Sequence, residues 1–195
     1  MASELGVSRG AVREALRTLR ALRVIETANG RRPQVASIND SVTTFLIDHA
    51  VETGQMSVTQ VLDVRRCLET RTAALAALRR TDGEARAIVE CAHALRAAAG
   101  SIERMTQQDI DFHAAIARAS RNPLFELIVT SFRSVMQKTC PVGWQSRPRE
   151  DWEKVFGLHE TLATAIDARD PVAAERIMGE HFDSTNQALL RAGLY

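Results

Sequence analysis

The feature that most restricts the fold of this chain is the helical spacing of its apolar residues after Ser57. These residues recur every three or four positions, and no run shows the alternation typical of a strand. The spacing predicts helices over about 58–80, 82–98, 102–120, 123–138, 150–169 and 172–192, with a loop from Pro141 to Pro148 and a connecting helix within 42–54. We therefore expect a mainly α fold, in which residues 39–195 form an antiparallel bundle of six to seven helices.

The first 38 residues follow another pattern. Residues 2–22 read as helix, tight turn and helix, with Gly6 in the turn and Ser8 as the N-cap of the second helix. Two strand-like runs then flank Asn29-Gly30, a dipeptide that favours a β-hairpin because its type I′ turn needs two positive φ angles. This order predicts a winged helix-turn-helix domain in residues 1–38. Since the sequence starts within the first helix of the helix-turn-helix, no helix precedes it, and we expect a truncated domain that lacks the first helix of a winged helix.

The positive charge of the chain is concentrated in this N-terminal segment. The formal net charge of the chain is +1, yet residues 9–32 contain seven arginines and two glutamates, a net charge of +5. Such a basic segment on a mildly acidic body is typical of a nucleic-acid-binding module. The alternative is a basic surface that is only solvated. The residues that we expect to contact DNA, in the second helix and in the wing, are Ser8, Arg9, Arg13, Arg17, Arg31 and Arg32.

Three of the predicted helices carry metal-binding side chains on the faces that should be buried. Asp109 and His113 lie one turn apart on the apolar stripe of 102–120, and His159 and His181 lie on the apolar faces of the last two helices. A buried carboxylate needs a cation, an arginine or a hydrogen-bond network, because leaving it unpaired costs roughly several kcal/mol. Imidazole and carboxylate ligands suit zinc, nickel, manganese or iron. The alternative is that each histidine is a hydrogen-bonded core residue.

Arg65 and Glu69 share the apolar face of helix 58–80. One interpretation is an ion pair between residues four positions apart, which stabilises an exposed helix by a few tenths of a kcal/mol, roughly. The other is that Arg65 faces the interior beside the metal and holds the carboxylate of a small ligand in a bidentate manner. The sequence leaves both interpretations open.

Several classes of protein are excluded by what the sequence lacks. No apolar run approaches the roughly 18 residues needed to span a bilayer, and the first residues do not have the pattern of a signal peptide. The three cysteines, Cys67, Cys91 and Cys140, are widely spaced and contain no CxxC motif, so neither a disulfide framework nor a thiolate metal site is indicated. We expect a cytoplasmic protein without membrane contact.

Both halves of the chain resemble one family. The stretch LGVSRGAVREALRTL is similar to the recognition motif of GntR-type bacterial transcription regulators. The stretches VRRCLETRTAALAALR, DIDFHAAIARASRNPLF and HETLATAIDARDPVAAERIMGEHF, in this order, resemble the helical ligand-binding domain, called FCD, of the FadR subfamily. The resemblance implies a divalent metal, zinc first, held by Asp109, His113, His159 and His181. It also implies an acidic effector at Arg65, and homodimers that bind near-palindromic operators.

These patterns lead to one main hypothesis and two alternatives. The main hypothesis is a DNA-binding regulator whose operator binding is controlled by a small carboxylate at a metal site, with no enzymatic activity. The first alternative is a metal-dependent hydrolase, since three histidines and an aspartate can also activate water. It lacks a general base, because Glu160 and Glu180 adjoin ligand histidines but should point away from them. The second alternative is a helical dimerisation module whose histidines only pack.

Overall fold

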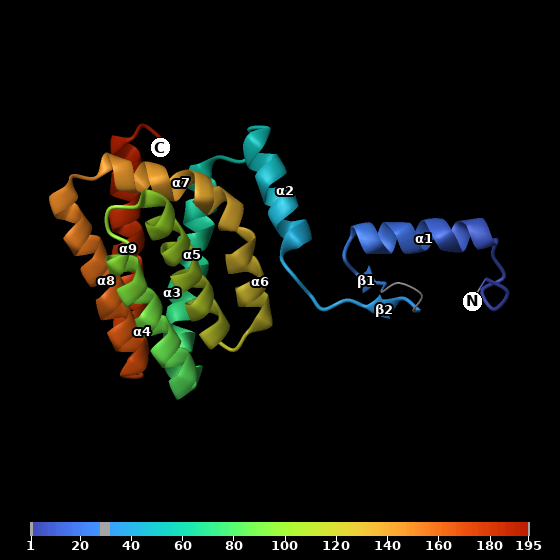
Figure 1. Cartoon of the computed structure of the whole chain (residues 1–195), viewed down its shortest axis with the longest axis horizontal. Coiled ribbons are helices and arrows are strands. Elements are labelled where there is room, and N and C mark those ends of the chain that lie inside the picture. The colour runs from blue at the N-terminus through green and yellow to red at the C-terminus, as the bar shows by residue number, and fades with distance from the viewer. Residues whose placement is uncertain (1, 28–31, 195) are drawn as a thin grey trace.

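The structure is a computed structural model that describes residues 2–27 and 32–194. It contains two short strands and, in these ranges, nine helices (Figure 1). Figure 1 shows the first helix and the hairpin joined by an extended segment to a helical bundle that holds the rest of the chain. The predicted mainly α fold is confirmed, while the division at residue 38 stays a prediction.

The N-terminal module contains one regular helix and one hairpin. Helix α1, Arg9–Ala21, begins where predicted, because the Ser8 side chain accepts a hydrogen bond from the Ala11 amide at 3.1 Å. Strand β1, Ile25–Glu26, pairs antiparallel with β2, Gln34–Val35, which confirms the hairpin. Its predicted turn at Asn29-Gly30 lies outside the described residues.

The start of the module differs from the expectation. Residues 2–6 form turns rather than helix, with Gly6 at a φ of +65°. So few residues cannot offset the cost of nucleating a helix without packing partners. Helix α1 itself buries none of its residues.

The bundle begins with α2 and is built mostly from helices with defined ends. Serine, threonine, asparagine or aspartate side chains cap α3, α4, α5, α6 and α9, and Ser57 and Thr81 each form a complete capping box. These caps are why most predicted boundaries agree with the structure. The helices are α2 (Ser41–Glu52), α3 (Val58–Arg79), α4 (Asp82–Ala97), α5 (Ile102–Ala119), α6 (Pro123–Ser131), α7 (Arg133–Ser146), α8 (Arg149–Asp167) and α9 (Pro171–Arg191).

The region after α5 corrects the sequence-based expectation. The single helix predicted over 123–138 is two helices, and α7 continues to Ser146, so most of the loop predicted from Pro141 is helical. Proline lacks an amide hydrogen and disfavours a helix interior. Here the burial of Val135, Met136 and Trp144 against the core stabilises α7 in spite of Pro141. With α2 included, the described residues after position 39 therefore form eight helices rather than six to seven.

Five helices enclose the core of the bundle. Helix α3 packs along α9, α9 along α8, α8 along α4, α4 along α5, and α5 again along α3. Small residues let α3 approach its neighbours closely, since Ala73, Ala76 and Ala77 are fully buried. Helix α7 crosses one end of this ring, where it contacts α5 and α9 (Figure 1). Among the described residues, no helix is both long and apolar enough to cross a membrane.

Candidate metal centre and its cavity

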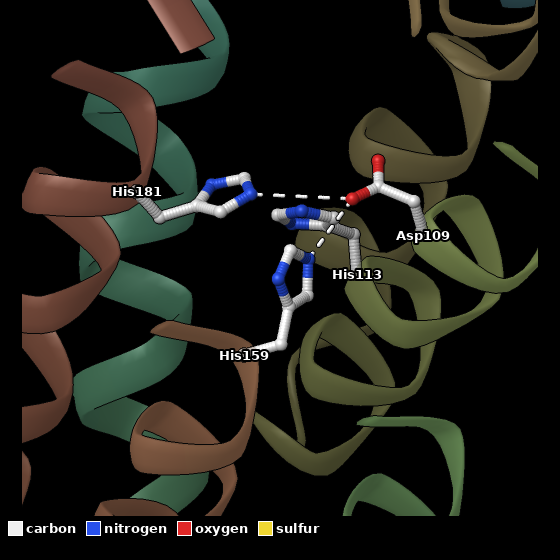
Figure 2. Close-up of side chains that lie close together, drawn as sticks. All are labelled: Asp109, His113, His159 and His181. Carbon is white, nitrogen blue, oxygen red and sulfur yellow. Dashed lines mark hydrogen bonds and ion pairs between the residues drawn. The ribbon is translucent and has the colours of Figure 1, made fainter. Parts of the chain in front are cut away.

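The four predicted metal ligands meet inside the ring of helices. Asp109 and His113 come from α5, His159 from α8 and His181 from α9. Figure 2 shows the imidazoles of His159 and His181 directed at the same carboxylate oxygen of Asp109. One ligand atom from each of the four side chains lies within 4.8 Å of the others, and all four residues are buried.

The hydrogen bonds at the edge of this cluster determine which ring nitrogen carries the hydrogen in His159 and in His113. His159 Nδ1 lies 2.8 Å from the carbonyl oxygen of Val155, which can only accept, so Nδ1 carries the hydrogen. In a neutral imidazole the lone pair of His159 Nε2 then faces Asp109 Oδ1 at 2.9 Å. Two acceptors this close repel each other unless a positive charge lies between or beside them. The pair therefore fits a bound cation.

His113 is held in the same way from another helix. Its Nδ1 is hydrogen-bonded to Oε2 of Glu69, whose ionised carboxylate can only accept. Its Nε2 is buried and has no hydrogen-bond partner among the described residues. A buried nitrogen lone pair without a partner is costly unless a ligand or an ion occupies its direction. Both His113 and His159 thus present an Nε2 lone pair to the cluster.

The ionisation of the other two ligands also suits a metal, which needs deprotonated donors. Burial would raise the pKa of Asp109, but the close contact with His159 and the neighbouring imidazoles hold this pKa well below its usual range. Burial lowers the pKa of His181 well below its usual range, so its imidazole is neutral. His181 Nε2 lies 4.0 Å from Asp109 Oδ1.

Arg65 and Glu69 combine parts of both interpretations left open by the sequence. The predicted ion pair forms, with Arg65 Nε 2.6 Å from Glu69 Oε1, but both side chains are buried rather than exposed. Because Glu69 also binds His113, it joins Arg65 to the metal cluster. Burial lowers the pKa of Arg65, but the carboxylate of Glu69 outweighs this effect and raises it. The contact of Glu69 with a ligand histidine was not predicted.

A small cavity lies beside the cluster, between Arg65 and α7. Its volume is ≈ 30 Å³ and it is lined by Asp109, His181 and several residues of α7. Two of its polar residues escaped the sequence analysis. Cys140 donates a hydrogen bond from Sγ to Asp109 Oδ2 at 3.4 Å, and Arg147 follows the last residue of α7. Arg147 falls in the segment predicted as a loop, and Cys140 lies just before this segment, beyond the predicted end of the preceding helix at residue 138. Helical spacing through Pro141 was the signal that could have placed both residues.

The predicted DNA-contacting residues are elsewhere, in the N-terminal module. Ser8, Arg9, Arg13, Arg17 and Arg32 are exposed, and Arg31 lies outside the described residues. On α1, Arg17 pairs with Glu14 at 2.8 Å. The structure brings none of these residues to the metal cluster.

The two glutamates considered as general bases point away from the cluster. Glu160 pairs with Arg96 at 2.6 Å, and Glu180 pairs with Arg176 on the same helix. This arrangement agrees with the expectation from their positions on the helices. Neither carboxylate is placed to take a proton from water at the cluster.

A comparison with protein-family models matches residues 60–184 to the FCD domain. The chain belongs to the FCD domain family. The four clustered ligands, Arg65 and most of the cavity lining lie within the matched range, while Thr185 and Leu189 of the lining follow it.

Curated relatives match almost the whole chain and are transcription regulators. The Glc operon transcriptional activator of Escherichia coli K12 is 29% identical over 197 residues, covering 97% of this chain and 77% of the relative. LutR, an HTH-type transcriptional regulator of Bacillus subtilis, is 27% identical over 97% of this chain and 88% of its own length. The putative L-lactate dehydrogenase operon regulatory protein of E. coli K12 is 28% identical over 98% and 76%. This FCD protein is therefore a GntR-type transcription regulator and not an enzyme.

Solved structures agree with the fold. Streptococcus agalactiae GntR superposes with a TM-score of 0.68 at 23% identity, covering 95% of this chain and 85% of that one. E. coli McbR/YncC has a TM-score of 0.59 at 20% identity, with coverage of 100% and 85%. The bundle and the N-terminal module thus share the fold of GntR-family structures.

Proposed function

We propose that this protein binds an operator as a homodimer and that a small carboxylate, held at a metal in the FCD domain, controls this binding. The observation that carries the proposal is the buried cluster of Asp109, His113, His159 and His181. Two of its imidazoles have a buried nitrogen without a hydrogen-bond partner among the described residues, Nε2 of His113 and Nδ1 of His181. A cluster of this kind is costly for a protein that uses it only for packing.

The donor set indicates which ions would bind there. Three imidazole nitrogens and one carboxylate oxygen suit zinc first, with nickel, manganese or iron as alternatives. Four protein ligands leave open positions on an ion that accepts six. When bound, the metal supplies a positive charge that attracts a carboxylate ligand. Glu69 and Val155 orient His113 and His159 toward it.

The same cavity supports a small carboxylate as the effector. Arg65 lines the cavity, and its guanidinium can hold a carboxylate in bidentate geometry. One relative is named for the operon of L-lactate dehydrogenase, an enzyme of a hydroxy-carboxylate. A hydroxy-carboxylic acid of a few carbon atoms agrees with the guanidinium at the cavity and with the name of this relative. To act as a switch, it must bind more tightly to one arrangement of the dimer than to another.

DNA binding is assigned to the N-terminal module. The proposed contacts are the N-cap of α1, three arginines of α1 and two arginines of the wing, on a near-palindromic operator whose symmetry matches a two-fold dimer. They are Ser8, Arg9, Arg13, Arg17, Arg31 and Arg32.

The metal site is tested by elemental analysis of purified variants. His159→Ala and His181→Ala should each reduce the bound metal from about one per chain to a small fraction, because each removes one of four ligands. His93→Ala is the matched control, since His93 is exposed on α4 and should leave the metal content unchanged. Circular dichroism establishes that each variant folds. Unchanged metal content in both cluster variants would reject the site.

The control of DNA binding is tested with a duplex selected from a random pool by the protein itself. Small carboxylic acids should change the dissociation constant of the metal-loaded protein for this duplex by about fivefold or more, a coupling of about 1 kcal/mol or more. Removing the metal with a chelator should abolish that response. If no carboxylate changes the affinity of the metal-loaded protein, the proposed control is wrong.

A further inference from the structure

Arg147 is a second buried guanidinium at the cavity, separate from Arg65. It is the C-cap residue of α7 and is only 9% exposed. Its Nη1 donates to the carbonyl oxygen of Gly143 and its Nη2 to that of Ser184, both at 3.1 Å. Its guanidinium lies 5.5 Å from the ring centroid of Trp144, another residue that lines the cavity. These contacts hold the side chain in place and use two of its five N–H donors.

The charge of Arg147 lacks a close partner. Among residues 2–27 and 32–194, no carboxylate oxygen forms an ion pair with its guanidinium within 4.0 Å, whereas Arg65 has Glu69 at 2.6 Å. The pKa values of Arg147 and Arg65 are shifted in opposite directions. Burial lowers the pKa of Arg147, while the carboxylate of Glu69 outweighs burial and raises the pKa of Arg65. A buried charge without a counter-ion is strongly unfavourable, so this position favours an anion.

The charges around the cavity indicate how much negative charge it takes. The buried ionised side chains that line it are the guanidinium groups of Arg65 and Arg147 and the carboxylate of Asp109. With the buried carboxylate of Glu69, which pairs with Arg65 behind the wall, these charges balance one another. The imidazoles of the cluster would bind a metal as neutral donors and add no charge. A divalent metal in the cluster would therefore leave two positive charges uncompensated. One monoanionic carboxylate removes half of this excess, and a dianion removes all of it.

We propose that Arg147 is the second anchor of the effector, and that the cavity selects a short dicarboxylate over a monocarboxylate. This inference rests on the proposed function and adds to it. One carboxylate lies at the metal and Arg65, and the other accepts hydrogen bonds from the free N–H groups of Arg147 in bidentate geometry.

The size of the cavity restricts the ligand to a few carbon atoms. A volume of ≈ 30 Å³ is enough for about two water molecules. A three-carbon acid therefore needs a small outward movement of α7, which supplies Met136, Cys140 and Trp144 to the wall. Pro141 lowers the cost of such a movement, because it removes one backbone hydrogen bond from the middle of this helix.

Malonate and lactate are a suitable pair of probes. Both have three carbons and both offer two oxygen ligands to a metal, but only malonate carries a second negative charge. We expect the full-length, metal-loaded protein to bind malonate at least about tenfold more tightly than lactate in isothermal titration calorimetry, because the second carboxylate adds charge-assisted hydrogen bonds to Arg147. Elemental analysis after the titration establishes that malonate has not removed the metal.

Variants of Arg147 then test the anchor itself. Arg147→Gln should reduce the preference for malonate to about threefold or less, chiefly by weakening malonate binding. Arg149→Gln is the matched control, because Arg149 is exposed, lies over Trp152 and should keep the full preference. If Arg147→Gln does not fold, Arg147→Lys replaces it. This variant keeps the positive charge but loses the planar guanidinium that can bind a carboxylate through two N–H groups. Its preference for malonate over lactate should therefore also fall to about threefold.

The outcomes separate the inference from the function on which it rests. Equal affinity for the two acids in the wild-type protein, or a preference that survives in the folded Arg147 variant, overturns the inference and leaves the proposed function standing. Equal weakening of both acids by Arg147→Gln has the same meaning, since it indicates a purely structural role. If neither acid binds to metal-loaded protein, the inference is overturned, and the DNA-binding titrations with other carboxylic acids decide the proposed function separately.

Discussion

Glu69 connects the proposed metal site with the arginine that is expected to bind the effector. Its two carboxylate oxygens bind different partners, Arg65 on its own helix and His113 on α5. It therefore fixes the ring of a metal ligand and at the same time holds the guanidinium expected to meet the effector. A ligand that draws Arg65 away from Glu69 would change the basicity of His113, which links effector binding to metal binding.

The Glu69→Gln variant tests this role. The amide keeps the size of the side chain but loses the negative charge that orients the Nδ1 hydrogen of His113. We expect the dissociation constant for zinc to rise by about 10- to 100-fold, measured by competition with a coloured chelator. Glu160→Gln is a matched control, because Glu160 neighbours His159 in sequence but pairs with Arg96 outside the cluster. Equal zinc affinity in the wild type and in Glu69→Gln would show that Glu69 only packs.

At the scale of elements, the caps explain why the helix boundaries were predictable. The N-terminus of α4 shows how they work: the Thr81 side chain accepts from the amide of Glu84, and the Glu84 carboxylate accepts from the amide of Thr81 at 2.7 Å. Glu84 also pairs with Arg121, at the end of α5, at 3.1 Å. The signal for this cap lies within four residues of sequence.

This cap should make the stability of the bundle depend on pH. Burial would raise the pKa of Glu84, but the hydrogen bonds from Thr81 and Arg121 hold it below the ordinary value of 4.5. As the pH falls, the carboxylate of Glu84 is therefore protonated in the unfolded chain before it is protonated in the folded protein. The stabilisation is complete above about pH 4.5 and is lost as the pH falls below this value. Glu84→Gln should lower the free energy of unfolding at pH 7 by about 0.5–1 kcal/mol. In urea titrations, the difference in free energy of unfolding between the wild type and Glu84→Gln should shrink toward zero near pH 3. A difference that stays constant with pH would show that the charge of Glu84 does not stabilise the cap.

Helix α7, in contrast, could not be predicted from its local sequence. Pro141 and Pro148 suggest a loop, yet the chain is helical up to Ser146. The reason is tertiary, because Met136 and Trp144 are buried against helices that are distant in sequence. Because the predicted helix ended at residue 138, the sequence did not place Cys140 or Arg147, which both depend on α7 to reach the cavity.

At the scale of the whole molecule, the proposal requires that the N-terminal module binds DNA. Arg13 is exposed on α1 and forms no ion pair with any of the described residues. We expect Arg13→Ala to weaken binding to the selected duplex by about tenfold and, if it contacts a phosphate, to reduce the slope of log affinity against log salt by about 0.9. Arg86→Ala, on the exposed side of α4, removes the same charge from the bundle and should change neither quantity. Equal effects of the two variants would place the DNA contact elsewhere.

The sequence by itself determined the features that depend on residue type and local spacing. These are the helical class, the α1 cap and hairpin, and the inward faces that carry Asp109, His113, His159 and His181, since periodicity and capping act over a few residues. Only the tertiary structure decided which side chains meet across helices. Glu69 reaches His113 over 44 positions, and Arg147 reaches Ser184 over 37, because of how the helices rotate and pack. No local pattern encodes such contacts, which arise from the burial of many apolar residues at once.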